Sequence, residues 1–292
     1  MATELKGKLA DKYVDVDGLR IRTIEAGQGP VALLFHGASL GSSADVFIRN
    51  MDPLAKAGFR AIAFDQPGFG LSDVPADHSV AYRRKMVPKM LDAMGLKKVA
   101  LVAHSQAGGM AVQLALQEPE RYSHVVVLGT GSLLPPLEEK KTQGEGREAA
   151  VQQRLERRMA QAEPTIDDTR KLLEANLFHH ELITPEELAL RHSRSVGRNF
   201  EAFVARNAEA EEAKKKPKEK SGPELWQRLT ELKMPLLMIF GRNDRANAYE
   251  RATLLKEKYP RLNLHIVDGC KHLVPWDAAD EMIRLVVPFL KS

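Results

Sequence analysis

Cysteine is almost missing from this sequence of 292 residues, and long apolar runs are missing altogether. The single cysteine, Cys270, excludes an internal disulfide framework and a CxxC zinc site, and it fits a reducing cytoplasm. No stretch reaches about eighteen uninterrupted apolar residues, so we expect no transmembrane helix and no membrane partner. The first residues, MATELKGKLADKY, contain no apolar signal-peptide core, so we expect a cytoplasmic protein.

Charge of one sign is not in large excess either, although the net charge is +4. Hydrophobic residues make up 43% of the chain and charged residues 28%, which is typical of a folded globular protein. The one basic run, KKKPKEK at Lys214–Lys220, has no aromatic residue within it, so we interpret it as a solvated linker. The composition therefore predicts no nucleic-acid partner.

Strand and helix patterns alternate along both ends of the chain. Short apolar runs rich in β-branched residues end at turn signals, and they begin at residues 19, 31, 59, 97, 124, 235 and 262. Helical patterns begin at Ala81 and Gly108, and a last one covers Ala279–Leu290. This alternation is typical of βαβ units and predicts an α/β fold with a buried, mostly parallel sheet.

The alternation breaks between Leu134 and Gly222, where the sequence is polar, rich in charge and helix-prone. We therefore predict one α/β core that is interrupted by a helical cap. The first part of the core covers residues 1–133, the cap insertion covers 134–222, and the second part of the core covers 223–292. Linkers around Leu134–Pro136 and Lys214–Pro223 mark the edges of the insertion.

The segment LVAHSQAGG places Ser105 between a strand and a helix. A nucleophile elbow holds a serine on such a turn, so that the hydroxyl projects above the sheet, and it needs small residues two positions away on each side. Here those residues are Ala103 and Ala107 rather than glycine. The pattern favours Ser105 as a nucleophile. From this segment alone, a serine that only caps the helix is the alternative.

An acid and a histidine follow Ser105 in the order that a catalytic triad requires. FGRNDR places Asp244 just after a strand, and VDGCKHLVPWD places His272 in the loop after the last strand. A neutral serine hydroxyl is a poor nucleophile, so an imidazole must take its proton and a carboxylate must orient the imidazole. We therefore predict Ser105 as nucleophile, His272 as general base and Asp244 as the orienting acid.

The negative charge that develops during attack needs two backbone N–H donors. Gln106 directly follows the serine, and we expect it to supply one donor. FHGAS follows an earlier strand, and we expect Ala38, with Ser39 beside it, to supply the other. We interpret His36 in the same motif as a structural residue that braces the loop.

Five motifs in this order, FHGAS, DQPGFGLSD, AHSQAGG, FGRNDR and CKHLVPWD, resemble the α/β-hydrolase superfamily over essentially the whole chain. The resemblance implies an eight-stranded, mostly parallel sheet with helices on both faces and an inserted helical cap. Within the superfamily, GTGSLLPP, the stretch LFHHELITPEELALRHSRS and the ending CKHLVPWDAADEMIRLVVPFL are most similar to the hydrolases of meta-cleavage products. Those enzymes split a C–C bond in 2-hydroxy-6-oxo-dienoates.

The resemblance also implies substrate contacts. Arg191 matches an arginine that binds the substrate carboxylate in that family, and a planar guanidinium suits this task. A solvated helix arginine is the alternative. The family usually has asparagine before the nucleophile and tryptophan after the histidine, where this chain has His104 and Leu273. Together with Ser39 these two residues are our remaining candidates for substrate contact, although His104 also fits a packed elbow residue.

The leading hypothesis is a serine hydrolase of a small carboxylate-bearing molecule that needs no cofactor and no metal. The bond cleaved is a C–C bond beside a ketone or, alternatively, a carboxylic ester. Cofactor-free lyase or dioxygenase chemistry is a remote alternative in which the histidine acts as base with little need for the serine. A non-catalytic ligand receptor is a further alternative, and the intact triad disfavours this alternative. A homodimer is left open, because nothing in the sequence tests it.

Overall fold

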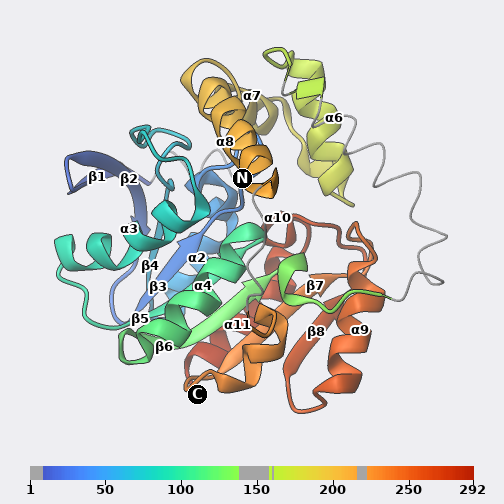
Figure 1. Cartoon of the computed structure of the whole chain (residues 1–292). Coiled ribbons are helices and arrows are strands. Elements are labelled where there is room, and N and C mark those ends of the chain that lie inside the picture. Colours follow the sequence, from blue (N-terminus) through green and yellow to red (C-terminus); the bar gives the residue numbers. More distant parts are fainter. Residues whose placement is uncertain (1–8, 138–157, 160, 216–221) are drawn as a thin grey trace.

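The computed structural model describes residues 9–137, 158–159, 161–215 and 222–292 (Figure 1). Its centre is one eight-stranded sheet in the order β1-β2-β4-β3-β5-β6-β7-β8. The β1–β2 and β2–β4 pairs are antiparallel, and every other neighbouring pair is parallel. The strands are β1 (Asp11–Val16), β2 (Leu19–Ala26), β3 (Val31–Phe35), β4 (Arg60–Phe64), β5 (Val99–His104), β6 (Tyr122–Leu128), β7 (Leu236–Gly241) and β8 (Asn263–Val267).

The predicted strands form where short β-branched runs are buried on both faces of the sheet. The five residues of β7 before Gly241 and all six residues of β5 are buried, which is typical of central parallel strands. The sequence patterns identify every strand except β1. Its side chains are mostly exposed, so Asp11–Val16 carries no apolar pattern to mark it.

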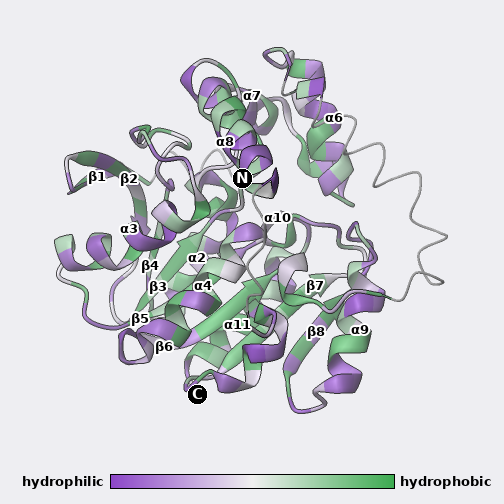
Figure 2. Cartoon of the chain, viewed as in Figure 1, coloured by the Kyte–Doolittle hydropathy of each residue, from purple (hydrophilic) through white to green (hydrophobic). Residues whose placement is uncertain are grey.

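Helices cover both faces of the sheet (Figures 1 and 2). Successive residues of a strand point to opposite faces. Leu33 and Phe35 therefore pack in the core beside α3, α4 and α9, whereas Ala32 and Leu34 pack beside α2, α10 and α11. These helices are α2 (Ile48–Lys56), α3 (Val80–Ala93), α4 (Gln106–Gln117), α9 (Ala248–Lys258), α10 (Val274–Asp277) and α11 (Ala279–Leu290). Short 3₁₀ segments are η1 (Ala44–Phe47), η2 (Pro119–Arg121), η3 (Gly131–Leu133), η5 (His180–Leu182) and η6 (Leu225–Glu231).

Among the described residues, three helices lie between β6 and β7. They lie above the sheet in Figure 1, and we refer to them as the cap helices. They are α6 (Ile166–Asn176), α7 (Pro185–Ser193) and α8 (Arg198–Lys215). Thr165 and Thr184 cap the first two, each accepting a backbone N–H through its side chain. Their contacts reach loops that follow β3, β4 and β8, which places the cap helices at the carboxyl edge of the sheet.

A buried ion-pair network joins the end of the cap helix α7 to the core. Arg194 lies 3.1 Å from Asp45, and Asp45 in turn lies 2.8 Å from the fully buried Arg22. Arg22 also pairs with Asp65 at 3.2 Å. Burial alone lowers the pKa of Arg22, but Asp65 and Asp45 outweigh it, so this pKa is raised and the guanidinium stays charged. Breaking one member of such a network leaves a buried charge without its partner.

The division of the chain at residues 134 and 222 stays a prediction. Both proposed linkers reach or approach segments that lie outside the described residues, and the basic run Lys214–Lys220 lies largely outside them too. Over the ranges given above, no helix combines the length and the apolar character that crossing a bilayer requires.

Candidate active site

Ser105, His272 and Asp244 form a continuous hydrogen-bonded line. The Nε2 atom of His272 lies 2.9 Å from the Ser105 hydroxyl oxygen. On the other side of the ring, Nδ1 lies 3.1 and 3.0 Å from the two carboxylate oxygens of Asp244. A carboxylate only accepts, so Nδ1–H donates to it and Nε2 is left to accept the hydroxyl proton. The three predicted triad residues, from three separate loops, therefore meet in the arrangement that base-assisted attack needs.

The backbone at Ser105 is strained in the way that an elbow requires. Ser105 has φ +58° and ψ −127°, although it is not glycine, and it joins the end of β5 to the start of α4. Its N–H donates to the Leu128 carbonyl at 2.8 Å, and its own carbonyl accepts from the Thr130 hydroxyl at 2.7 Å. Ala103 and Ala107 are almost fully buried, so alanine fits at both flanking positions. A strained residue held by its surroundings is a frequent feature of reactive sites.

His36 braces the loop that carries the expected oxyanion donor. Its Nε2 accepts from the Gln66 N–H at 2.9 Å, so its Nδ1–H donates to the Gly37 carbonyl at 2.6 Å. Burial lowers the pKa of His36 to about 3, and therefore the ring stays neutral at physiological pH. Such a ring fixes the loop without taking part in proton transfer.

Ala38 and Gln106 remain predictions as oxyanion donors. Gln106 is the first residue of α4, so its N–H has no acceptor within that helix. Ala38 follows Gly37 directly, and a Cβ placed on Gly37 would lie only 2.9 Å from the Cβ of Ser105. The loop therefore runs against the serine.

Arg191 and Ser39 meet in the fold, although 152 positions separate them in the chain, and Ser39 lies two residues after Gly37. The Arg191 Nη2 donates to the Ser39 hydroxyl at 3.0 Å, and the buried Nε of Arg191 has no hydrogen-bond partner among the described residues. Burial lowers the pKa of Arg191 to about 10. Within the described part of the chain, no carboxylate lies within ion-pair distance of this guanidinium. An anion would compensate this buried cation.

The structure places His104 and Leu273 beside His272 rather than in open solvent. His104 is buried, and its Nε2–H donates to the His272 carbonyl at 2.8 Å. Burial lowers the pKa of His104 well below its usual value, so the ring is neutral. Leu273 is buried in the core on the α2 side, and its N–H donates to the Asn176 carbonyl at 3.1 Å. Their roles as substrate contacts stay predictions. The hydrogen bonds of these two residues position the histidine loop.

A cavity of about 310 Å³ opens onto the line of Ser105, His272 and Asp244. Its walls also include Gln106 and Thr130. Cavities of roughly 300 to 1,000 Å³ suit small organic ligands. A small molecule therefore has access to the serine hydroxyl.

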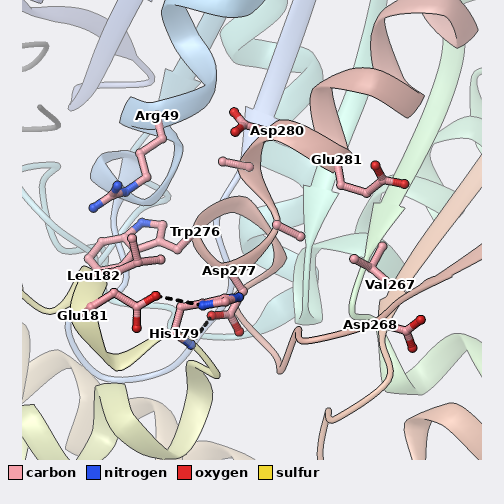
Figure 3. Close-up of a pocket in the computed structure, with 12 residues that line it drawn as sticks. Arg49, His179, Glu181, Leu182, Val267, Asp268, Trp276, Asp277, Asp280 and Glu281 are labelled. Carbon is pink, nitrogen blue, oxygen red and sulfur yellow. Dashed lines mark hydrogen bonds and ion pairs between the residues drawn. The ribbon is translucent and has the colours of Figure 1, made fainter.

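A second hollow, of about 530 Å³, lies between η5, α10 and the start of α11 (Figure 3). The Asp277 carboxylate on its wall accepts N–H bonds from Phe178, His179 and Lys271 at 2.8 to 3.0 Å. Sequence reasoning did not single out Asp277, whose only signal is its place at the end of CKHLVPWD. This aspartate joins the segment after α6 to the residue before His272. Among the described residues, no three His, Cys, Asp or Glu side chains gather closely enough to share a metal ion.

Comparison with known proteins identifies the family. The family model described as the alpha/beta hydrolase fold matches residues 30–279. A 2-hydroxy-6-oxo-6-phenylhexa-2,4-dienoate hydrolase of Burkholderia cepacia is 31% identical, with 99% of each chain covered. A 2-hydroxy-6-oxononadienedioate/2-hydroxy-6-oxononatrienedioate hydrolase of Burkholderia vietnamiensis is 32% identical, with 96% of this chain and 95% of the relative covered.

The solved structures agree on the fold. The meta-cleavage product hydrolase of Pseudomonas fluorescens IP01 superposes with a TM-score of 0.74 at 24% identity, over 96% of this chain and 97% of that one. The predicted fold, an eight-stranded and mostly parallel sheet with helices on both faces, is confirmed. With this fold and with relatives that match from end to end, the chain belongs to the α/β-hydrolase family and, within it, to the meta-cleavage product hydrolase type.

Proposed function

We propose that this protein hydrolyses a C–C bond of a 2-hydroxy-6-oxo-dienoate, with Ser105, His272 and Asp244 as its catalytic triad. The observation that carries the proposal is the hydrogen-bonded line from the Ser105 hydroxyl to the Asp244 carboxylate. The names of the full-length relatives support the substrate class. The buried cation of Arg191 supports a substrate that bears a carboxylate.

In this proposal Arg191, with Ser39, holds the carboxylate of the dienoate, and a fork of guanidinium donors fits that group. The dienol first ketonises. The C6 carbonyl then lies against Ser105, and the Ala38 and Gln106 amides receive the charge that develops on its oxygen. His272 takes the proton of Ser105, or of a water molecule, as the new bond to C6 forms.

The C5–C6 bond then breaks, and its electron pair leaves with C5 as a dienolate. His272 returns a proton to that fragment. Where Ser105 is the attacking group, water next attacks the acyl-Ser105 with His272 again as base, and a carboxylic acid departs. The sum of these steps adds one water molecule across one C–C bond and needs no redox partner.

The test follows the visible absorbance of 2-hydroxy-6-oxo-6-phenylhexa-2,4-dienoate and of the matching nonadienedioate with purified protein. We expect the wild type to bleach at least one of them. Ser105→Ala should lose about 10³-fold or more in kcat, because the base has no hydroxyl to activate. Wild-type activity in Ser105→Ala would contradict the proposal and favour histidine-driven lyase or dioxygenase chemistry, which oxygen uptake would reveal.

An aryl acetate serves as the comparison substrate. Its brisk hydrolysis, with no bleaching of either dienoate, would show a carboxylesterase instead. Labelling of Ser105 by a fluorophosphonate separates a hydrolase from a ligand receptor, since only an activated hydroxyl reacts. Pairing of two copies and a cytoplasmic location also stay predictions, for which light scattering and cell fractionation are the direct measurements.

A further inference from the structure

Two arginines near the nucleophile have no part in the proposed mechanism. They are Arg83 on α3 and Arg206 on the cap helix α8, and both pack against the ring of Phe69. The Arg206 guanidinium carbon lies 3.8 Å from the ring centroid, and that of Arg83 lies 5.3 Å from it. One arginine from the core and one from the cap thus contact the same aromatic ring.

Among the described residues, these two arginines donate hydrogen bonds only to neutral groups. Arg83 donates to the side-chain oxygens of Gln66 at 3.0 Å and Gln106 at 2.7 Å. Arg206 donates to the Gly68 carbonyl at 2.6 Å. Arg83 is 3% exposed, and its buried Nε has no hydrogen-bond partner in the part of the chain that the structure describes. Across the described ranges no carboxylate comes within ion-pair distance of either guanidinium, in contrast to Arg22 with its three aspartates.

Two neighbouring cations without an anion are costly to bury. Burial lowers the pKa of both groups, to about 10 for Arg83 and about 9 for Arg206, and repulsion from Arg83 adds to the shift of Arg206. Both values still leave the guanidinium groups charged at pH 7. Elsewhere in the described chain, buried arginines such as Arg22 are paired with carboxylates of the same chain. The lack of such a carboxylate beside Arg83 and Arg206 is therefore consistent with a ligand that supplies one.

The pair also lies close to the reaction centre. Gln106, whose side chain accepts from Arg83, directly follows Ser105 in the chain. Arg83, Arg191 and Arg206 each lower the pKa of His36 electrostatically, so all three charges are felt at the loop beside the serine. Arg191 holds Ser39, whereas Arg83 and Arg206 share Phe69, so the cations form two separate groups.

We propose that Arg83 and Arg206 form a second carboxylate site and that the substrate is therefore a dicarboxylate of the 2-hydroxy-6-oxononadienedioate class. This inference rests on the proposed function, because it assigns one carboxylate to Arg191 and the other to the new pair. A phenyl group in the same place would leave the buried Arg83 and the half-buried Arg206 without an anion. Cleavage of the C5–C6 bond of the nonadienedioate releases 2-hydroxypentadienoate and succinate, so the Arg83–Arg206 pair would hold the succinate end.

The experiment compares kcat/KM for the nonadienedioate and for the 6-phenylhexadienoate in the same protein. We expect the wild type to prefer the dicarboxylate by about 10²-fold, the size of one charge-assisted pair. Arg206→Met should abolish most of that preference through a higher KM for the dicarboxylate. Its kcat/KM for the phenyl substrate should change by less than about threefold. Arg206→Lys, which keeps the charge, should retain part of the preference.

Arg83→Met is expected to act in the same direction, and Arg84→Met is the matched control. Arg84 is the next residue of α3 and contacts Gln113 on α4, away from Phe69, so its loss should leave the preference unchanged. Inhibition by succinate gives a second readout that needs no turnover. Succinate should inhibit the wild type more strongly than benzoate does, and Arg206→Met should remove that difference.

Two results would overturn the inference. One is a wild type that cleaves the phenyl substrate as well as the dicarboxylate or better. The other is a decrease in kcat/KM of Arg206→Met that is equal for both substrates, while its thermal unfolding temperature is that of the wild type. A wild type that cleaves neither substrate would instead contradict the proposed function, so the two failures are distinct.

Discussion

The close approach of one glycine to the nucleophile sets the geometry of the reaction centre at the residue scale. A Cβ on Gly37 would lie 2.9 Å from the Cβ of Ser105 and 3.2 Å from the His104 ring. Both neighbours are held in place, Ser105 by its strained turn and His104 by its bond to the His272 carbonyl. No flexible group is available to move aside.

Gly37→Ala is therefore expected to lower kcat by about 10²-fold, because a small displacement of the serine or of the Ala38 amide costs that much. Steady-state kinetics with the dienoate would measure the change. Gly222→Ala is the matched control, since a Cβ at Gly222 meets nothing within 4 Å. Equal activity of the two variants would show that the loop has room beside the serine.

Arg191→Gln should raise KM for the dienoate and lower kcat/KM by about 10²-fold, because a charge-assisted bond to the substrate carboxylate is lost. Arg191→Lys keeps the charge but not the planar fork, so we expect an intermediate value. Kinetics on both variants with one batch of substrate would separate charge from geometry. An unchanged KM in Arg191→Gln would show that this arginine does not contact substrate.

At the scale of elements, the histidine loop is fastened from both ends. The His104 ring binds the His272 carbonyl, and Asp277 at the end of α10 binds the N–H of Lys271. Asp277 also binds the N–H groups of Phe178 and His179, which follow α6. One carboxylate thus joins the segment after a cap helix to the loop that carries the base, and Figure 3 shows Asp277 beside His179.

Asp277→Asn should destabilise the fold by about 1–3 kcal/mol, since an amide replaces a charged acceptor of three N–H groups. It should also lower kcat, because the loop before His272 loses one of its two attachments. Urea unfolding and kinetics would test both effects. Asp280→Asn changes an exposed position three residues later, and its free energy of unfolding should stay within about 0.5 kcal/mol of that of the wild type. Similar losses in both variants would contradict this role for Asp277.

Over the whole molecule, the core buries two neutral histidines beside several cations. Burial, together with the nearby arginines, lowers the pKa of His36 to about 3, and burial lowers that of His104 well below 6.5. Between these values and 6.5 the unfolded chain binds protons that the folded chain does not. The free energy of unfolding therefore falls as pH falls through this range.

For His36 this linkage predicts that the free energy of unfolding falls by about 2 kcal/mol between pH 7 and pH 5. Glutamine cannot be protonated in this range. In His36→Gln the free energy of unfolding should therefore fall by about 2 kcal/mol less than in the wild type between pH 7 and pH 5, whatever the stability of the variant at pH 7. Urea titrations at both pH values would measure it. His180→Gln, at an exposed ring, should keep the wild-type fall. A His36→Gln variant with the full wild-type fall would show that His36 is protonated in the native state.

Some features of this protein follow from local sequence. Seven strands and the elbow at Ser105 are readable because buried strands need β-branched runs and a tight strand–helix turn needs small residues. The order of serine, acid and histidine also follows from the chain alone. The sequence patterns did not predict β1, because an exposed edge strand carries no apolar pattern.

The sequence by itself therefore determined the fold class and the three candidate catalytic residues, whose types and order are local properties. Only the tertiary structure decided which charged side chains share a site. Arg83, Arg191 and Arg206 lie on three different helices, and nothing in the sequence near each one distinguishes a solvated arginine from a buried one. The packing between core and cap decides that Arg83 and Arg191 are buried and that Arg83 and Arg206 contact the same ring. It also decides that no carboxylate among the described residues pairs with these arginines. That packing depends on segments that meet only in the folded chain.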